Sequence, residues 1–445
     1  MSSEVVYNLL GLRKYTFKEV KELELGLGLD LQGGMNVTLE VSVVDLVKSL
    51  SNFSKDSTFN SAIKLAVQKQ KNSQEDFVTL FGKAFEEVSP SGKLASIFNT
   101  LELKDQIKYN STNGEVLDVL RKETKVAIDN SFNIIRTRID RFGVAQPNIQ
   151  PLQTAGRILV ELPGIDDPKR VRKLLQGTAN LEFWETYDNS EVYQYLAQAN
   201  QKIAEIQAIK AQTSVTSTDT TAKAATTPAN SLLNELDNKA KTDTSAVAKN
   251  ADMKKQFPLF SILQPRATAQ GQLYPGAAVG TAHFKDTATV NSYLKLDQVK
   301  AVLPRNLTFK WTAKAEDKAE NFFTLVAIKV TSRDGRAPLE GDVITDARQD
   351  YADMGSRPEV SMSMNSEGAK IWARLTKDNV GKSIAIVLDG YVRSYPNVNG
   401  EITGGRSSIT GLESIEEAKD LANILKSGKM PAPAVILTED IVGPS

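Results

Sequence analysis

A strict alternation of apolar and polar positions marks the first predicted strand. The sequence from Met35 to Val43, Met-Asn-Val-Thr-Leu-Glu-Val-Ser-Val, places every second side chain on one buried face. Further along, apolar residues recur at steps of four and three within residues 115–142, which predicts one long helix with a single apolar stripe. The stripe consists of Ile128, Phe132, Ile135, Ile139 and Phe142.

Four more elements follow this helix. Residues 148–153 and 157–162 predict two strands joined by a short loop that contains Gly156. A helix that begins at Pro168 and a strand over residues 180–185 come next. The resulting order, β-α-β-β-α-β, is that of the split, ferredoxin-like fold.

Residues 257–405 predict a second α+β unit. Residues 322–330 form a strong strand candidate, and residues 359–364 alternate again before a helix that carries Trp372. The pair Asp389-Gly390 between two apolar runs predicts a hairpin, because this dipeptide suits a tight two-residue turn.

The end of the chain predicts a return to the first fold. A capping box, Ser414-Ile-Glu-Glu417, opens a helix, and residues 434–437 form a last short strand. The predicted fold class is therefore α+β, with a ferredoxin-like base domain and a second α+β head domain inserted into it. The predicted boundaries are 20–187 for the base, with a peripheral helical insertion at about 44–113, 188–255 for a low-complexity linker, 256–410 for the head and 411–445 for the return to the base.

The composition excludes several classes of protein. The chain has 54 basic and 54 acidic side chains and no basic block, which argues against nucleic acid as a partner. It has no cysteine, so disulfides, thiolate nucleophiles and cysteine-based zinc sites are excluded, and His283 is its single histidine. We therefore expect no catalytic residue, no metal and no cofactor. The sequence contains no run of 18 apolar residues, so no segment of it is predicted to span a bilayer.

Two glycine-rich stretches resemble nucleotide-binding loops only in part. Gly26-Leu-Gly28 precedes a strand, whereas a dinucleotide loop links a strand to a helix. Residues 400–407 match a phosphate-binding loop except that Arg406 stands where lysine is required. Carboxylates are plentiful, but nothing marks any two as a catalytic pair. The alternative function is a periplasmic glycan-binding or hydrolytic protein.

Several blocks of the chain resemble the SecD family, the accessory subunits of the Sec protein translocase, either as SecD or as the SecD part of a SecDF fusion. The opening block, Leu27-Gly-Leu-Asp-Leu-Gln-Gly-Gly34, resembles the signature at the start of the family's large periplasmic domain. The other blocks follow the family's order and are residues 130–147, 156–164, 174–183, 422–433 and 442–445. Two stretches, 44–113 and 194–252, are longer than in compact family members.

The resemblance implies a soluble fragment of a membrane-anchored protein, on the periplasmic side of the inner membrane. The implied function is to bind unfolded preproteins that emerge from the SecYEG channel and to help pull or release them. SecF is an implied further partner, and the proton-motive force is the implied energy source. The proton-carrying residues of the family lie in membrane segments outside this sequence. A passive structural spacer is a third possibility.

The signature turn is the first group of candidate site residues. It consists of Gly28, Asp30, Gln32, Gly33 and Gly34. Glycine permits backbone angles that other residues resist, and the polar side chains can brace the turn. We expect this turn to lead into the first strand of the base domain.

The other candidates lie in or beside the head. The candidate hinge between head and base consists of Thr186, Asp188 and Gly411. The candidate preprotein-binding face consists of Val360, Met362 and Met364, because methionine side chains adapt to varied shapes. The alternative is that this strand face packs against the helix that carries Trp372.

Overall fold

The chain folds into two compact units of mixed α/β structure in a computed structural model of the 445 residues. The first unit comprises Met1–Ala179 and Asp420–Ser445, and the second comprises Asn180–Lys419. Over the described part of the chain, no helix is both long and apolar enough to cross a bilayer. The structure describes residues 5–9, 13–16, 33–73, 75–100, 102–142, 144, 147–152, 156–165, 167–215, 256–268, 270–316, 321–332, 334–351 and 357–443.

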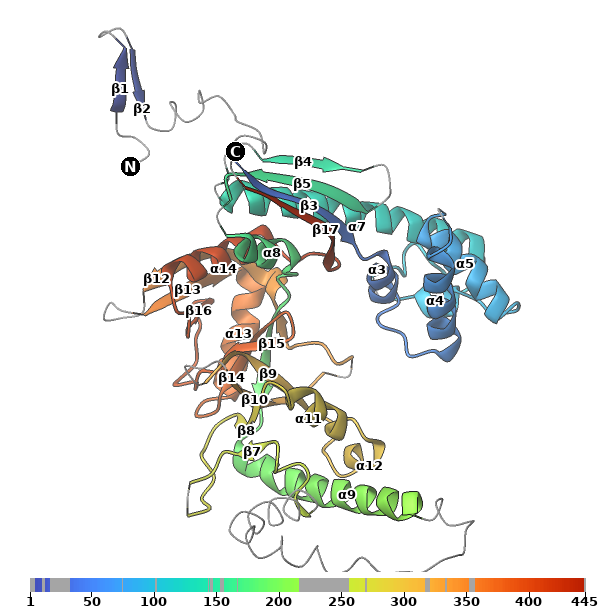
Figure 1. The fold of residues 1–445 in the computed structure, drawn as a ribbon, viewed down its shortest axis with the longest axis vertical. Helices are drawn as coiled ribbons and strands as arrows, with labels where there is room; N and C mark the ends of the chain where they lie inside the picture. Colours follow the sequence, from blue (N-terminus) through green and yellow to red (C-terminus); the bar gives the residue numbers. More distant parts are fainter. Residues whose placement is uncertain are drawn as a thin grey trace, which may run out of the picture. The chain divides into compact units, whose positions relative to one another are not determined.

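A four-stranded antiparallel sheet organises the first unit (Figure 1). Its strand order is β17-β3-β5-β4. The strands are β3 (Gly34–Val41), β4 (Asn148–Pro151), β5 (Arg157–Pro163) and β17 (Ala434–Val442). A separate two-stranded ribbon is formed by β1 (Val5–Leu9) and β2 (Arg13–Thr16).

One face of the four-stranded sheet carries the core of the first unit. Helices α7 (Asn113–Phe142) and α8 (Pro168–Gln176) pack on this face. Alternate β3 side chains from Met35 to Val41 are fully buried there, together with Ile135 and Ile139 of α7. The first predicted strand and the long amphipathic helix are therefore confirmed.

The last strand of the predicted ferredoxin-like order does not belong to this sheet. β6 (Leu181–Thr186) lies in the second unit, where it pairs with strands β10, β11 and β14. The place beside β3 is taken by β17, from the far end of the chain. The predicted base domain, residues 20–187, is therefore wrong at its C-terminal end, because local alternation identifies a strand without identifying its partner.

Residues 43–120 form a helical subdomain in the first unit. Its helices are α3 (Val43–Leu50), α4 (Ser57–Gln70), α5 (Phe77–Val88), α6 (Ala95–Phe98) and the first part of α7. Four phenylalanine rings with centroids 5.7–6.2 Å apart form its centre: Phe59, Phe81, Phe85 and Phe98. The predicted helical insertion thus has a hydrophobic core of its own.

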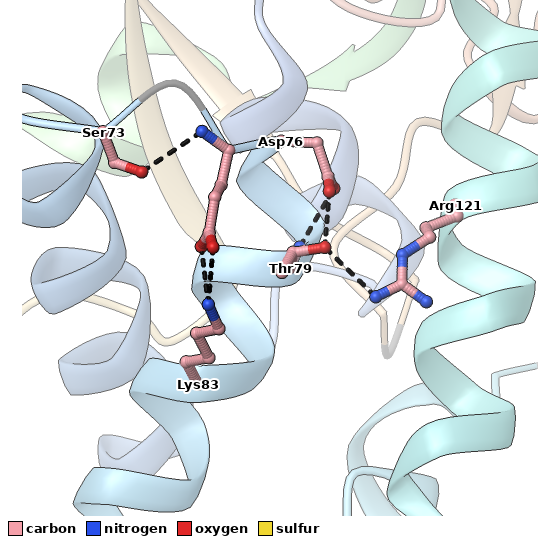
Figure 2. A network of polar contacts seen from close by, with 6 residues as sticks. Ser73, Asp76, Thr79, Lys83 and Arg121 are labelled. Atoms are coloured by element: carbon pink, nitrogen blue, oxygen red, sulfur yellow. Dashed lines mark hydrogen bonds and ion pairs between the residues drawn. The ribbon is translucent and has the colours of Figure 1, made fainter.

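A polar network joins the start of α5 to α7 (Figure 2). Asp76 caps α5 by accepting a hydrogen bond from the backbone N–H of Thr79 at 3.0 Å. Arg121 of α7 donates to the hydroxyl of Thr79 at 3.1 Å. Lys83, further along α5, pairs with Glu75 at 2.7 Å. These groups are largely exposed, so we expect their contacts to add little to stability beside the buried phenylalanine core.

An eight-stranded sheet forms the centre of the second unit within the described residues, in the order β11-β6-β14-β15-β9-β10-β8-β7. The Asp389-Gly390 turn joins β14 to β15, and both turn residues have positive φ, as the sequence predicts. The strands besides β6 are β7 (Gln264–Pro265), β8 (Ala278–His283), β9 (Leu307–Ala315), β10 (Phe322–Lys329), β11 (Leu339–Glu340), β14 (Ile384–Leu388) and β15 (Tyr391–Ser394).

Helix α9 (Asn189–Val215) lies where the sequence analysis predicts a linker. Four buried residues recur along it at steps of four, three and four: Val192, Leu196, Ala199 and Ile203. With α11 (Thr287–Leu294) and α12 (Asp297–Lys300), this stripe packs on the core of the eight-stranded sheet. The predicted linker over 188–255 is therefore wrong in its first part, because this polar stretch has one buried helical face. Residues 216–255 lie outside the described residues.

A three-stranded sheet of order β12-β13-β16 completes the second unit. Its strands are β12 (Ile344–Tyr351), β13 (Pro358–Met364) and β16 (Arg406–Ile409). Helix α13 (Ser366–Asp378) follows β13 and is capped by Asn365, whose side chain accepts from the N–H of Gly368 at 2.7 Å. The ring of Trp372 on α13 lies 5.0 Å from the ring of Phe183 on β6.

The boundary between the units falls inside helix α14 (Ile415–Ser427), between Lys419 and Asp420. The helix opens with the predicted capping box, in which the N–H of Glu417 donates to Ser414 Oγ at 3.1 Å. Lys314 of β9 donates to the carbonyl of Gly411 at 3.4 Å and to Glu417 at 2.7 Å. The prediction that the base resumes at residue 411 is therefore wrong, because these contacts hold residues 411–417 to the second unit.

Candidate functional site

The predicted preprotein-binding face does not form an open apolar surface. Val360 and Met362 are completely buried on β13, and Met364 is partly buried. β13 is the middle strand of its sheet, and α13 follows it directly and packs against it. The candidate binding face is therefore wrong for Val360 and Met362, and their burial agrees with the alternative that this strand face packs against α13.

Two residues of the predicted signature turn are described, and both have turn geometry. Gly33 has φ of 68° and Gly34 has φ of 140°, angles that residues with a side chain rarely adopt. The carbonyl of Gly33 accepts a hydrogen bond from the N–H of Gly164 at 3.1 Å. Gly28, Asp30 and Gln32 lie outside the described residues.

The three predicted hinge residues lie inside the second unit, away from its boundaries. Thr186 is buried in β6, and its hydroxyl donates to the carbonyl of Ser383 at 2.7 Å. Gly411 has φ of 80° and is held by Lys314. The chain enters this unit between Ala179 and Asn180.

Asp188 has a structural function just after β6. Its carboxylate accepts hydrogen bonds from the N–H of Gly276 at 2.7 Å, the N–H of Ser190 at 3.0 Å and the hydroxyl of Ser190 at 2.6 Å. Partial burial raises the pKa of this carboxyl group, but the bonds from Ser190 and Gly276 outweigh burial and hold the pKa below its usual value of 3.8.

We predict that Asp188→Asn makes the second unit less stable at pH 7 but not at strongly acid pH. A lowered folded-state pKa gives stability that is present above the unfolded pKa of about 4 and is lost as pH falls through the folded value. Thermal unfolding at pH 7 and at pH 2.5 measures the effect. The difference in melting temperature between wild type and variant is expected to shrink towards zero at the lower pH; a constant difference contradicts the prediction.

An exposed aromatic patch lies at one end of the eight-stranded sheet. We define it as His283 and Phe284, at the end of β8, and Phe322, at the start of β10. Phe284 is 48% exposed and Phe322 is 36% exposed. The His283 ring lies 4.6 Å from the Phe284 ring and 5.5 Å from the Phe322 ring.

The strand pairing fixes the geometry of this aromatic patch. Phe322 and His283 face each other in the antiparallel pair β8–β10, and Phe284 N–H donates to the carbonyl of Asn321 at 2.8 Å. His283 Nδ1 accepts a hydrogen bond from the N–H of Lys285 at 3.3 Å. Sequence reasoning missed the patch, because only the pairing of β8 with β10 brings Phe322 to His283-Phe284.

Three more of the described carboxyl groups have a lowered pKa. Hydrogen bonds from the N–H of Phe59, the N–H of Arg336 and the Arg172 side chain hold the pKa of Asp56, Asp334 and Glu439, respectively, below the ordinary value. A general acid needs a raised pKa instead. No cluster of three or more potential metal-ligating side chains occurs in the residues that the structure describes.

Comparison with known proteins identifies the family. The family model described as the SecDF P1 head subdomain matches residues 324–432, and the one described as the N-terminal part of the P1 domain of protein translocase subunit SecDF matches residues 128–188. Protein translocase subunit SecD of Rhodothermus marinus is 41% identical over 437 residues, which cover 97% of this chain and 64% of that protein. The chain belongs to the SecD family.

More distant SecD relatives cover the chain to a similar extent. Protein translocase subunit SecD of Syntrophobacter fumaroxidans is 28% identical over 449 residues, 95% of this chain and 60% of that protein. A crystal structure of SecDF in a super-membrane-facing form is 21% identical, covers 94% of this chain and 32% of its own chain, and gives a TM-score of 0.39. This chain thus spans less than two thirds of the SecD proteins that it matches.

Arg138 lies within the segment that matches the SecD P1 model and is completely buried. Its guanidinium donates to the carbonyls of Leu174 and Gly428, each at 3.2 Å, and to the carbonyl of Gly177. It also donates to Ser427 Oγ at 2.9 Å. These acceptors lie at the C-termini of helices α8 and α14. One buried cation therefore donates hydrogen bonds to the free carbonyls of two helix ends and offsets the partial negative charge there. Arg138 stands among other charged residues of α7, and no pattern in the sequence indicates that its side chain is buried.

Proposed function

We propose that this chain is the periplasmic part of a protein-export accessory subunit that binds unfolded preproteins. The observation that carries the proposal is the 41% identity to a protein translocase subunit SecD over 97% of this chain. In this proposal the chain acts beside the SecYEG channel and SecF, on the periplasmic side of the inner membrane. Membrane segments outside this sequence couple it to the proton-motive force.

A ferredoxin-like base with an inserted head is the proposed finer architecture. The first unit is split in sequence, since Asn180–Lys419 separates its two parts. Its sheet order, β17-β3-β5-β4, fits a βαββαβ arrangement in which β17 supplies the last strand. The second unit is then the head, and the segments around Ala179–Asn180 and Lys419–Asp420 are the proposed hinge in place of the three predicted residues. Ala179 has φ of 57°, an unusual backbone angle for alanine.

The aromatic patch is the proposed contact surface for unfolded polypeptide. Unfolded chains expose apolar side chains, and partly exposed aromatic rings offer large apolar area at low cost in side-chain entropy. His283 and Phe322 are fixed by strand pairing, so little order has to be gained when a polypeptide binds. Lys285, with its ammonium 5.7 Å from the Phe284 ring centroid, adds a positive charge beside the rings.

Photocrosslinking at defined positions tests this contact surface. A photoreactive amino acid at Phe284 is expected to crosslink a urea-unfolded secretory protein, because this side chain is half exposed. The same amino acid at Met362 is the matched control, because Met362 is buried in the same unit. Equal adducts at both positions, or equal adducts with the folded secretory protein, would overturn the proposed contact surface.

A further inference from the structure

β12 presents an open strand edge in the second unit. It pairs with β13 on one side and is a terminal strand of its three-stranded sheet within the described part of the chain. The strand has eight residues, and the side chains of Thr345 and of residues 348–351 are exposed. The backbone N–H and C=O groups along such an edge are able to pair with a strand of another chain, so β12 is a surface for strand addition.

Two carboxylates lie side by side on one face of this edge. Asp350 lies directly opposite Glu359 of β13, and like charges in this position destabilise a strand pair. Arg348 lies on the same face, two residues before Asp350. Within the described residues, none of Arg348, Asp350 and Glu359 forms an ion pair. A positive charge that approaches Asp350 from outside the sheet would therefore offset the repulsion.

The sequence of this edge is complementary to itself. Antiparallel pairing of two β12 strands about Gln349 places Arg348 of each strand opposite Asp350 of the other. The same register places Tyr351 of each strand opposite Ala347 of the other. The Tyr351 side chain, which is 54% exposed, is then covered by a small apolar neighbour.

We propose that β12 binds a second copy of this chain by antiparallel strand addition centred on Gln349. The two three-stranded sheets then form one six-stranded sheet, and two Arg348–Asp350 pairs join the new neighbours. The charges select this partner, because a strand with an acidic residue opposite Asp350 or a basic residue opposite Arg348 adds repulsion. The paired surface is small, so we expect a weak association that depends on protein concentration.

Engineered cysteines test the proposal without background, because the chain has no cysteine. Gln349→Cys places a thiol opposite its own copy, where the two Cα atoms lie about 5 Å apart, within reach of a disulfide. Thr345→Cys, exposed on the same strand, is the matched control, because its two copies lie about 26 Å apart in this register. Mild oxidation of the full chain is expected to give at least about tenfold more disulfide-linked dimer for Gln349→Cys. Equal dimer yields, or Gln349→Cys crosslinking a urea-unfolded, cysteine-containing secretory protein in preference to its own copy, would overturn the proposal.

Charge reversal in the Gln349→Cys chain provides a second readout. Arg348→Glu or Asp350→Lys alone places like charges opposite each other twice, and each is expected to lower the dimer yield about tenfold. The two substitutions together restore opposite charges in the same register and are expected to restore the yield. Both side chains are exposed, so the melting temperature of each variant is expected to stay close to that of the parent chain. A yield that neither single reversal lowers, or that the double reversal fails to restore, would also overturn the proposal.

Discussion

Arg138→Met is expected to lower the free energy of unfolding of the first unit by about 3–5 kcal/mol. Methionine retains the aliphatic part of the side chain but removes every donor of the guanidinium. The carbonyls of Leu174, Gly177 and Gly428 then lose a buried partner at two helix C-termini. Each buried acceptor left without a hydrogen bond costs about 1–3 kcal/mol, and relaxation of the chain recovers part of the sum.

Urea denaturation with far-ultraviolet circular dichroism measures this loss. Arg136→Met is the matched control, because Arg136 lies on the same helix and is exposed. The control is expected to change the free energy of unfolding by less than about 0.5 kcal/mol. Similar losses in both variants would mean that the helix, and not the buried guanidinium network, determines the effect.

Phe81→Ala is expected to destabilise the helical subdomain by about 3–5 kcal/mol. Phe81 is completely buried, and its ring contacts the rings of Phe59, Phe85 and Phe98. Truncation removes these edge-to-face and tilted contacts and leaves a cavity among four helices that cannot close fully.

Phe53→Ala provides the control for this second substitution. Phe53 belongs to the same subdomain but is 67% exposed, so its removal is expected to leave stability nearly unchanged. Denaturation monitored at residues 43–120 by hydrogen exchange separates loss of the subdomain from loss of the whole unit. If Phe81→Ala and Phe53→Ala lose the same stability, the phenylalanine cluster is not the core that stabilises the subdomain.

Local elements of this fold could be predicted because their signals are local. The stripe of α7 and the Asp389-Gly390 turn each lie within one short stretch of sequence. Helix α14 begins as its capping box predicts. In each case a period, a turn dipeptide or a cap determines the structure without a distant partner.

Strand partners and burial could not be predicted in the same way. β6 alternates like a base-domain strand, yet it pairs with β14 from residues some 200 positions later. Met362 is a candidate binding residue in the sequence, yet the structure buries it in a middle strand. Both outcomes depend on which segments meet in space, and alternation states only that one face is apolar.

The wrong prediction of a linker at helix α9 has a different cause. Its buried stripe, Val192, Leu196, Ala199 and Ile203, has a helical spacing that is visible in the sequence. The many threonine, serine and alanine residues that follow it lower the apolar content of the region as a whole and obscure the stripe.

We propose that the chain assists export by binding unfolded polypeptide at its aromatic patch. The most direct measurement is the export rate of a secreted reporter in cells whose SecD carries this chain in place of its own matching region. Phe284→Ser with Phe322→Ser is expected to slow export about tenfold, since buried aromatic contacts dominate such interfaces. Tyr274→Ser with Tyr351→Ser, two exposed tyrosines of the same unit outside the patch, is the control and is expected to leave export unchanged. Export at the wild-type rate in the phenylalanine variant, with the protein present at its normal level, would contradict the claim.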